Sequence, residues 1–305
     1  MVLVDGEPEK TRFGFIALIG LPNTGKSTLI NRLVGDKVAI VTPKAQTTRC
    51  RVVGLCASGS SQLAFIDTPG IYEPRHRLDR AMVQTAWRGI EEADIVVLLL
   101  DATRRYDALS QTLAQNVEKS ARIAVLAINK VDKVERSRLL PLVAEVTTGR
   151  RFTATYMISA LTGDGVDTMR GALADMVPAG GWLYPGDQMM DMPVRVWAAE
   201  ITREILFRRL HQEIPYALAV TTEEWRELGD GSLRIEQRIQ VTRESHKPIV
   251  VGQGGRQIKG IGKSARMELE KTLGRRVHLF LRVKVDPKWQ DDPEFYRAMG
   301  LVFPH

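Results

Sequence analysis

The sequence predicts an α/β domain with a mostly parallel sheet and helices on both faces, followed by a smaller α+β domain. Two observations predict this fold class. Up to about Val177, apolar runs alternate with helical patterns, as in sheets whose crossovers are helices; the runs cover residues 15–20, 63–67, 95–101, 123–130 and 156–160. Prolines and glycines then interrupt the pattern, and a different order of elements follows. We therefore expect a first domain over 1–177, a linker over 178–193, and a second domain with a C-terminal tail over 194–305.

Composition narrows the class of protein. The 305 residues are 44% hydrophobic and 26% charged, which is typical of a globular chain with about two domains. The longest apolar run, residues 95–100, is too short to cross a bilayer, and the N-terminus lacks the pattern of a signal peptide, so we expect a cytoplasmic protein. Cys50 and Cys56 lack the spacing of a metal site or a disulfide framework. The net charge of +7 favours a polyanionic partner.

The first glycine-rich loop, GLPNTGKS at residues 20–27, follows an apolar strand and precedes a helical pattern. In a phosphate loop of this kind, backbone N–H groups converge on the β-phosphate at a helix N-terminus. Lys26 would reach the β/γ oxygens, and the Ser27 hydroxyl would bind Mg²⁺. The alternative is a chance match in a glycine-rich turn.

Base recognition is predicted at NKVD, residues 129–132, after the strand expected over 123–128. An ionised Asp132 accepts hydrogen bonds only, so it can take both N–H donors on the guanine edge, a pair that adenine lacks. Asn129 would tie this loop to the phosphate loop, and Lys130 would lay its stem over the ring. A backbone N–H of SAL, residues 159–161, would meet the guanine carbonyl oxygen.

DTPG, residues 67–70, ends another expected strand. Asp67 would hold Mg²⁺ through water, and the Gly70 N–H would bind the γ-phosphate, which makes residues 71–82 a switch segment. A second switch segment covers residues 42–49, where we predict Thr48 rather than Thr47 as the Mg²⁺ ligand. The alternative for both threonines is a strand preference.

In the second domain we expect strands over 194–200, 216–225, 233–243 and 277–285, and helices over 201–210 and 256–273. GQGG, residues 252–255, follows the apolar run 249–251, interpreted as a strand, and precedes a basic helix, which is the order of a KH domain whose G-x-x-G loop clamps single-stranded RNA. Residues 232–288 contain 14 lysines and arginines against five aspartates and glutamates. The alternative is an ordinary turn beside a solvated face, and Ile258 and Ile261 are expected in the core. The RNA-binding prediction covers Gly252, Gln253, Gly254, Gly255, Arg256, Lys259, Lys263 and Arg266.

Jointly, these motifs resemble those of the translation-factor-like GTPases, and with the second half the chain is similar over its whole length to the Era family of bacterial KH-domain GTPases. The resemblance implies GTP and GDP as ligands, Mg²⁺ as cofactor, and binding near the 3′ end of 16S ribosomal RNA during small-subunit assembly. It also implies a KH variant with a helix between its first two strands. The implied nucleotide-binding residues are Gly20, Asn23, Thr24, Gly25, Lys26, Ser27, Thr28, Asp67, Gly70, Asn129, Lys130, Asp132, Ser159, Ala160 and Leu161.

The catalytic assignment rests on Lys26, Thr48 and Gly70. Ile71 stands where small regulatory GTPases carry a water-positioning glutamine, so we expect slow intrinsic hydrolysis. Asn23 resembles the asparagine with which related GTPases hold K⁺ beside the phosphates; the alternative is a loop cap. We expect a monomer, and the family has also been linked to peripheral contact at the inner membrane, although the sequence shows no amphipathic anchor.

Two other functions remain open at the level of sequence. A GTPase that acts on transfer RNA would need further catalytic residues, such as a reactive cysteine, and none is evident. A structural RNA-binding protein with a degenerate nucleotide site would not need its intact Lys26, Ser27, Asp67 and Asp132.

Overall fold

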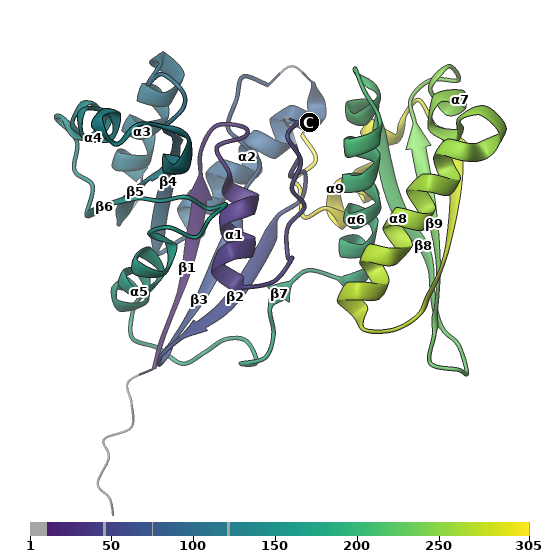
Figure 1. Cartoon of the computed structure of the whole chain (residues 1–305), viewed down its shortest axis with the longest axis horizontal. Coiled ribbons are helices and arrows are strands. Elements are labelled where there is room, and N and C mark those ends of the chain that lie inside the picture. Colours follow the sequence, from purple (N-terminus) through teal and green to yellow (C-terminus); the bar gives the residue numbers. More distant parts are fainter. Residues whose placement is uncertain (1–10, 45–46, 75, 121–122, 305) are drawn as a thin grey trace, which may run out of the picture. The chain divides into compact units, whose positions relative to one another are not determined.

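The computed structural model describes residues 11–44, 47–74, 76–120 and 123–304. The chain divides into two compact units (Figure 1). The first contains the described residues of Met1–Ala39, Cys50–Arg75 and Met82–Asp191. The second contains the described residues of Met192–His305 and of two segments from the first half of the chain, Ile40–Arg49 and His76–Ala81.

The first unit contains a seven-stranded sheet in the order β6-β5-β4-β1-β3-β2-β7. Its strands are β1 (Arg12–Ile19), β2 (Val52–Ser58), β3 (Ser61–Asp67), β4 (Ile95–Asp101), β5 (Ala124–Asn129), β6 (Ala154–Met157) and β7 (Met190–Asp191). β1, β3, β4, β5 and β6 run parallel, while β2 pairs antiparallel with both β3 and β7. The predicted mostly parallel sheet is confirmed.

Helices cover both faces of this sheet because successive side chains of a strand point to opposite faces. In β1, Ile16 and Leu18 pack with α1 and α5, whereas Ala17 and Ile19 pack with the other three helices. All four side chains are fully buried. The helices are α1 (Lys26–Val34), α2 (Arg77–Glu92), α3 (Ala108–Ser120), α4 (Leu139–Thr147) and α5 (Val166–Met176), with 3-10 turns η1 (Val131–Lys133) and η2 (Arg136–Arg138).

The second unit is a three-stranded sheet with helices packed against it. Its sheet has the order β10-β9-β8, with β8 antiparallel and β10 parallel to β9. Leu206, Ile239 and Ile261 meet in its core, as expected for Ile261, and Ile258 packs against them partly buried. Its elements are α6 (Val194–Arg209), η3 (Ile214–Ala217), β8 (Leu218–Glu227), β9 (Leu233–Val241), α7 (His246–Val251), η4 (Gln253–Gly255), α8 (Arg256–Leu273), β10 (Val277–Val285), η5 (Trp289–Asp291) and α9 (Pro293–Ala298).

Three expectations for this unit are wrong. Residues 194–200 begin α6 instead of forming a strand. The helix is buried on nearly every side from Trp197 to Phe207, so its apolar residues show no one-sided helical period. The run before the glycine loop is α7, not a strand. No helix lies between the first two strands, because β8 and β9 form a hairpin.

Candidate functional site

The predicted nucleotide motifs lie at the carboxyl ends of parallel strands in the first unit. The phosphate loop follows β1, DTPG follows β3, NKVD follows β5, and residues 159–161 follow β6. Carboxyl ends of parallel strands meet at one edge of a sheet, and ligands of open α/β folds bind there. The sheet therefore gathers four motifs that are far apart in the sequence.

The phosphate loop turns directly into α1. Gly25 is the residue before the helix and has a left-handed backbone, with φ 101°. A Cβ at Gly25 would lie 2.3 Å from Asn129 Nδ2, and one at Gly20 would lie 2.5 Å from the carbonyl oxygen of Leu99. Both positions therefore need glycine. Thr24 closes the turn by donating its hydroxyl to the carbonyl of Leu21 at 3.0 Å; Thr28 lies in the first turn of α1.

Lys26 is buried at the start of α1. Its ammonium donates to the carbonyls of Gly20 at 3.0 Å and Leu21 at 3.1 Å, so it lies inside the loop that would surround a phosphate chain. Burial lowers the pKa of Lys26 to about 8, against the opposing charge of Asp67. A phosphate oxygen would restore the charged form.

Ser27 and Asp67, the residues predicted to hold Mg²⁺ together with Thr48, lie within hydrogen-bond distance of each other. The Ser27 hydroxyl donates to Asp67 Oδ2 at 2.9 Å, and Asp67 is fully buried. Hydroxyl and carboxylate oxygens suit Mg²⁺, which takes few protein ligands and completes its shell with water and phosphates. The donor set therefore fits this ion. Within the described part of the chain, no cluster of three or more His, Cys, Asp or Glu side chains could hold a metal.

Gly70 packs against the phosphate loop. A Cβ there would lie 2.8 Å from the backbone nitrogen of Pro22. The next residue, Ile71, donates its N–H to the carbonyl of Gly20 at 3.2 Å and is 7% exposed. The start of the 71–82 segment is thus held beside the loop expected to carry the phosphates.

Asn129 joins three loops. Its amide nitrogen donates to the carbonyl of Thr24 at 2.7 Å, and its amide oxygen accepts the N–H of Ala160 at 2.9 Å. The base loop, the phosphate loop and residues 159–161 are thereby fixed to one another; the sequence predicts the tie to the phosphate loop but not the one to Ala160. Because Asn129 is buried, these two hydrogen bonds hold its side chain in one geometry.

The other base-loop residues surround this junction. Lys130 has a left-handed backbone with φ 66°, and its ammonium donates to the carbonyl of Asn23 at 2.7 Å. Asn23 is also left-handed, with φ 64°. Asp132 is exposed in η1. Ser159 is buried and accepts the N–H of Thr162 at 3.1 Å, while the side chain of Leu161 is 63% exposed.

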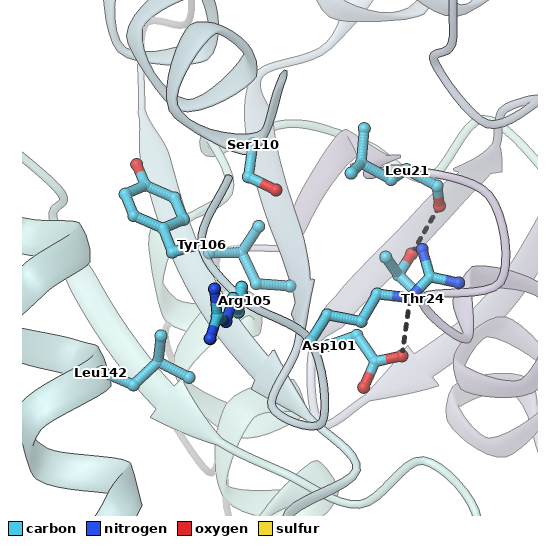
Figure 2. Close-up of a pocket in the computed structure, with 9 residues that line it drawn as sticks. Leu21, Thr24, Asp101, Arg105, Tyr106, Ser110 and Leu142 are labelled. Carbon is cyan, nitrogen blue, oxygen red and sulfur yellow. Dashed lines mark hydrogen bonds and ion pairs between the residues drawn. The ribbon is translucent and has the colours of Figure 1, made fainter. Parts of the chain in front are cut away.

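Asp101, at the end of β4, also belongs to the site, although none of the sequence motifs includes it. Its carboxylate accepts a hydrogen bond from Lys130 at 2.5 Å. It also lines a cavity beside the phosphate loop, together with Leu21 and Thr24 (Figure 2). The available signal was its position, because β4 lies between β1 and β5 and a carboxylate ends its apolar run.

Thr47 and Thr48 belong to the segment Ile40–Arg49, which packs within the second unit. The Thr47 hydroxyl donates to the carbonyl of Lys44 at 2.8 Å and lies 2.6 Å from the Thr42 hydroxyl. Thr48 is 9% exposed. In the same segment, Ala45 and Gln46 lie outside the described residues. The Mg²⁺ role of Thr48 stays a prediction.

The second glycine loop connects α7 to α8. Gly252, Gly254 and Gly255 all have positive φ, at 72°, 60° and 75°. A Cβ at Gly252 would lie 2.5 Å from the Cβ of Gln257, whereas open space surrounds Gly254 and Gly255. The backbone of the last two glycines is therefore accessible to an extended ligand.

The basic side chains that follow lie along α8. Arg256 donates to the side-chain oxygen of Gln253 at 2.8 Å, and Arg266 approaches Glu270 at 4.0 Å. Lys259 and Lys263 are exposed. Spacings of three, four and three residues place the four cations along one side of the helix, where they can follow a phosphate backbone.

Comparisons with known protein families match both the nucleotide-motif half and the KH half of the chain. The family described as "50S ribosome-binding GTPase" matches residues 15–130, and the family described as "KH domain" matches residues 213–290. The GTPase Era of Bradyrhizobium sp. strain ORS 278 is 54% identical over 96% of this chain and 96% of its own.

Two solved structures match with a TM-score of 0.90. Era of Aquifex aeolicus bound to GDP and AlF4⁻ is 39% identical, over 95% of this chain and 99% of its own. An Era in complex with MgGDPNP and nucleotides 1506–1542 of 16S ribosomal RNA is 40% identical over the same shares. With the nucleotide motifs assembled in the first unit and a KH fold in the second, the chain belongs to the Era family of GTPases.

Proposed function

We propose that this chain binds GTP at the carboxyl edge of its first sheet, hydrolyses it slowly, and binds the 3′ region of 16S ribosomal RNA through its KH unit during assembly of the small subunit. The observation that carries the nucleotide site is the Asn129 bridge from Thr24 to Ala160, because it joins the phosphate and base loops. The proposed binding of GTP and of the 3′ region of 16S ribosomal RNA is supported by a relative at 40% identity, whose structure contains MgGDPNP and nucleotides 1506–1542 of this RNA.

Guanine is read by the base loop. Asp132 accepts both N–H donors of the guanine edge, and the stem of Lys130 covers one face of the ring. A backbone N–H from the stretch Ser159, Ala160 and Leu161 donates to the guanine carbonyl oxygen. The exposure of Asp132 supports this role, since its carboxylate is open to a ligand.

The phosphates lie over the loop from Gly20 to Thr28. Lys26 leaves the carbonyls that it now contacts and binds β/γ oxygens, while N–H groups at the start of α1 bind the β-phosphate. Ser27, Thr48 and Asp67 would hold Mg²⁺, which when bound would supply positive charge to these phosphate oxygens. Gly70 donates its N–H to the γ-phosphate.

Hydrolysis is slow because Ile71 offers no group to orient water. Asn23 supports a K⁺ ion beside the phosphates through its side chain, which would add positive charge where the transition state gains negative charge. Its left-handed backbone is equally compatible with a loop cap, the alternative reading of this residue.

RNA binds along the second glycine loop and α8. The open backbone of Gly254 and Gly255 allows phosphates to approach Gly252–Gly255, and the exposed cations Arg256, Lys259, Lys263 and Arg266 follow the RNA chain. The excess of basic residues between 232 and 288 supports this face.

The domain boundaries at 177/178 and 193/194 are part of the proposal. The end of α5 at Met176 and the start of α6 at Val194 support them. We further propose a cytoplasmic monomer whose contact with the inner membrane, where it occurs, is peripheral. No helix among the described residues has the length and apolar character needed to cross a bilayer.

A nucleotide-hydrolysis assay tests the function. Purified protein with Mg²⁺ should hydrolyse GTP but not ATP, and a single-stranded RNA from the 3′ end of 16S ribosomal RNA should bind and change the rate. A transfer RNA should do neither. Absence of GTP turnover with retained RNA binding would instead indicate a structural RNA-binding protein.

A further inference from the structure

The carboxylate of Asp101 receives four hydrogen-bond donors or cations at the end of β4. The Thr103 N–H and hydroxyl donate to Oδ1 at 3.0 and 2.7 Å. The Lys130 ammonium donates to Oδ2 at 2.5 Å, and Arg104 Nε lies 3.5 Å from the same oxygen. The side chain is only 2% exposed. These contacts use nearly all the acceptor capacity of a carboxylate.

The charge of Asp101 is maintained by these partners. Burial alone would raise the pKa of the carboxyl group, but hydrogen bonds from Lys130 and Thr103 outweigh it and lower the pKa below its ordinary value. Asp101 is therefore an anion at neutral pH, and a buried anion beside Lys130 fixes where the ammonium lies.

Lys130 connects Asp101 to the phosphate loop. Its ammonium also donates to the carbonyl of Asn23 at 2.7 Å, so one cation holds the end of β4 and the loop after β1 together. Figure 2 shows Asp101 beside the loop that carries Thr24. A lysine side chain held at its tip loses less conformational freedom when a ligand packs against its stem.

We infer that Asp101 is a positioning residue for guanine-nucleotide binding, which acts by holding Lys130 where its stem meets the base. The inference rests on the nucleotide site proposed above and adds a residue outside the four motifs that define it. A solely structural role, as a cap for Thr103, would not require Lys130.

The test is a double-mutant cycle with Asp101→Asn and Lys130→Met, measured as affinity for GDP and for a non-hydrolysable GTP analogue. Asp101→Asn removes the charge but keeps the shape. This variant should bind both nucleotides more weakly by the same factor, about 10- to 100-fold, which is the range for one hydrogen bond to a charged group. The turnover number at saturating GTP should change far less than the affinity, because the stem of Lys130 meets the base and not the γ-phosphate.

The cycle separates positioning from structure. In the Lys130→Met background, where the stem remains but the ammonium is gone, Asp101→Asn should cause no further loss. Asp101→Glu restores the charge and should recover part of the affinity, and it also serves if Asp101→Asn does not fold. Losses that multiply in the double mutant, or unchanged affinity in Asp101→Asn, would overturn the inference.

Asp107→Asn is the matched control. Asp107 lies at the end of the loop that joins β4 to α3, and its carboxylate accepts the N–H and hydroxyl of Ser110 at 2.9 and 2.7 Å. Unlike Asp101, it is exposed and binds no lysine among the described residues. Its nucleotide affinity should equal that of the wild type. A wild type that binds neither GDP nor GTP would remove the proposed site, and this inference with it.

Discussion

At the scale of single residues, Lys26 predicts a proton linkage. Its pKa of about 8, set by burial, means that part of the ammonium is neutral at pH 8.5. Bound phosphate favours the charged form and raises the pKa, so binding should take up protons at that pH. GTP affinity should consequently fall as pH rises, approaching about tenfold per pH unit above 8.

Calorimetry of GTP binding at pH 8.5, in two buffers with different ionisation enthalpies, measures this uptake directly. Lys26→Met provides the comparison, because its affinity should be low and nearly independent of pH between 7.5 and 9.5. Equal binding enthalpies in the two buffers for the wild type would show that the Lys26 ammonium is already fully charged before GTP binds.

Asp132 predicts the choice of base. Asp132→Asn replaces an acceptor with a group that also donates, so GTP affinity should fall about 100-fold or more, and xanthosine triphosphate, whose base edge is complementary, should bind better than to the wild type. Competition binding with both nucleotides checks this. An Asp132→Asn variant that keeps its affinity for GTP would assign base recognition to other residues.

The sequence identifies site residues that belong to local patterns and misses those defined only by spatial neighbours. Asn129 was predicted because NKVD has a recognisable spacing after a strand. Asp101 could not be found in this way, because its partner Lys130 is 29 residues away and only the parallel pairing of β4 with β5 brings them together. For Thr48 the local pattern predicts a metal ligand. The pattern does not indicate that the segment Ile40–Arg49 packs within the second unit.

At the scale of elements, the loop between α7 and α8 predicts how RNA binding fails. Gly254→Asp combined with Gly255→Asp places two carboxylates where phosphates approach. Repulsion and lost backbone access should weaken the binding of single-stranded RNA from the 3′ end of 16S ribosomal RNA by about 100-fold or more, while the affinity for GTP stays unchanged. Titrations of RNA and GTP at two salt concentrations measure both effects.

The β8–β9 hairpin supplies a matched control for this variant. Gly229→Asp with Gly231→Asp adds the same charge at two open positions, one of them with φ 78°. RNA affinity should then fall far less. Equal losses in the two double variants would attribute the effect to net charge alone, and unchanged RNA binding in the loop variant, with a folded circular dichroism spectrum, would make GQGG an ordinary turn.

The continuous apolar strands of the first unit were predicted well, whereas the start of a buried helix and a very short helix were not. The strand runs of the first unit were found because parallel strands covered on both faces read as continuous apolar stretches. The part of α6 over 201–209 agrees with the helix predicted over 201–210, whereas its first residues, 194–200, were interpreted as a strand, because Trp197, Ala198, Ala199 and Glu200 are all buried and leave no polar face in this stretch. α7 has only six residues with Pro248 at its third position, which is too short for periodicity to show.

At the scale of the whole molecule, the second unit includes the described residues of the predicted switch segment 42–49 and residues 76–81 of the predicted switch segment 71–82. Arg49, which is 1% exposed, donates to the carbonyls of Leu218 at 2.6 Å and Tyr216 at 3.1 Å, and its guanidinium lies 5.8 Å from the ring centre of Trp289. Arg77, from the other region, contacts Asp291 at 2.9 Å. The chain's C-terminal segment thus contacts residues of both.

These contacts predict that nucleotide state and RNA affinity are coupled. If a γ-phosphate holds residues 42–49 and 71–82, the packing of Arg49 and Arg77 within the second unit should change, and by reciprocity RNA binding should then change GTP affinity. Arg77→Gln removes the ion pair with Asp291 and the contact with Phe303, whose ring centre lies 5.2 Å away. The ratio between the RNA affinity measured with a GTP analogue and that measured with GDP should fall by about threefold to tenfold in this variant.

The measurement is RNA affinity of each variant with GDP and with a non-hydrolysable GTP analogue. Arg275→Gln is the control, because Arg275 pairs with Glu227 at 2.9 Å and has a similar exposed fraction, 36% against 39% for Arg77, but lies on the hairpin side of the same unit. It should leave the difference intact. If the two nucleotides give the same RNA affinity in the wild type, or if Arg77→Gln keeps the full difference, the contacts at Arg77 do not transmit the nucleotide state. Because the Arg77 pair is exposed, loss of folding is not expected to confuse the result.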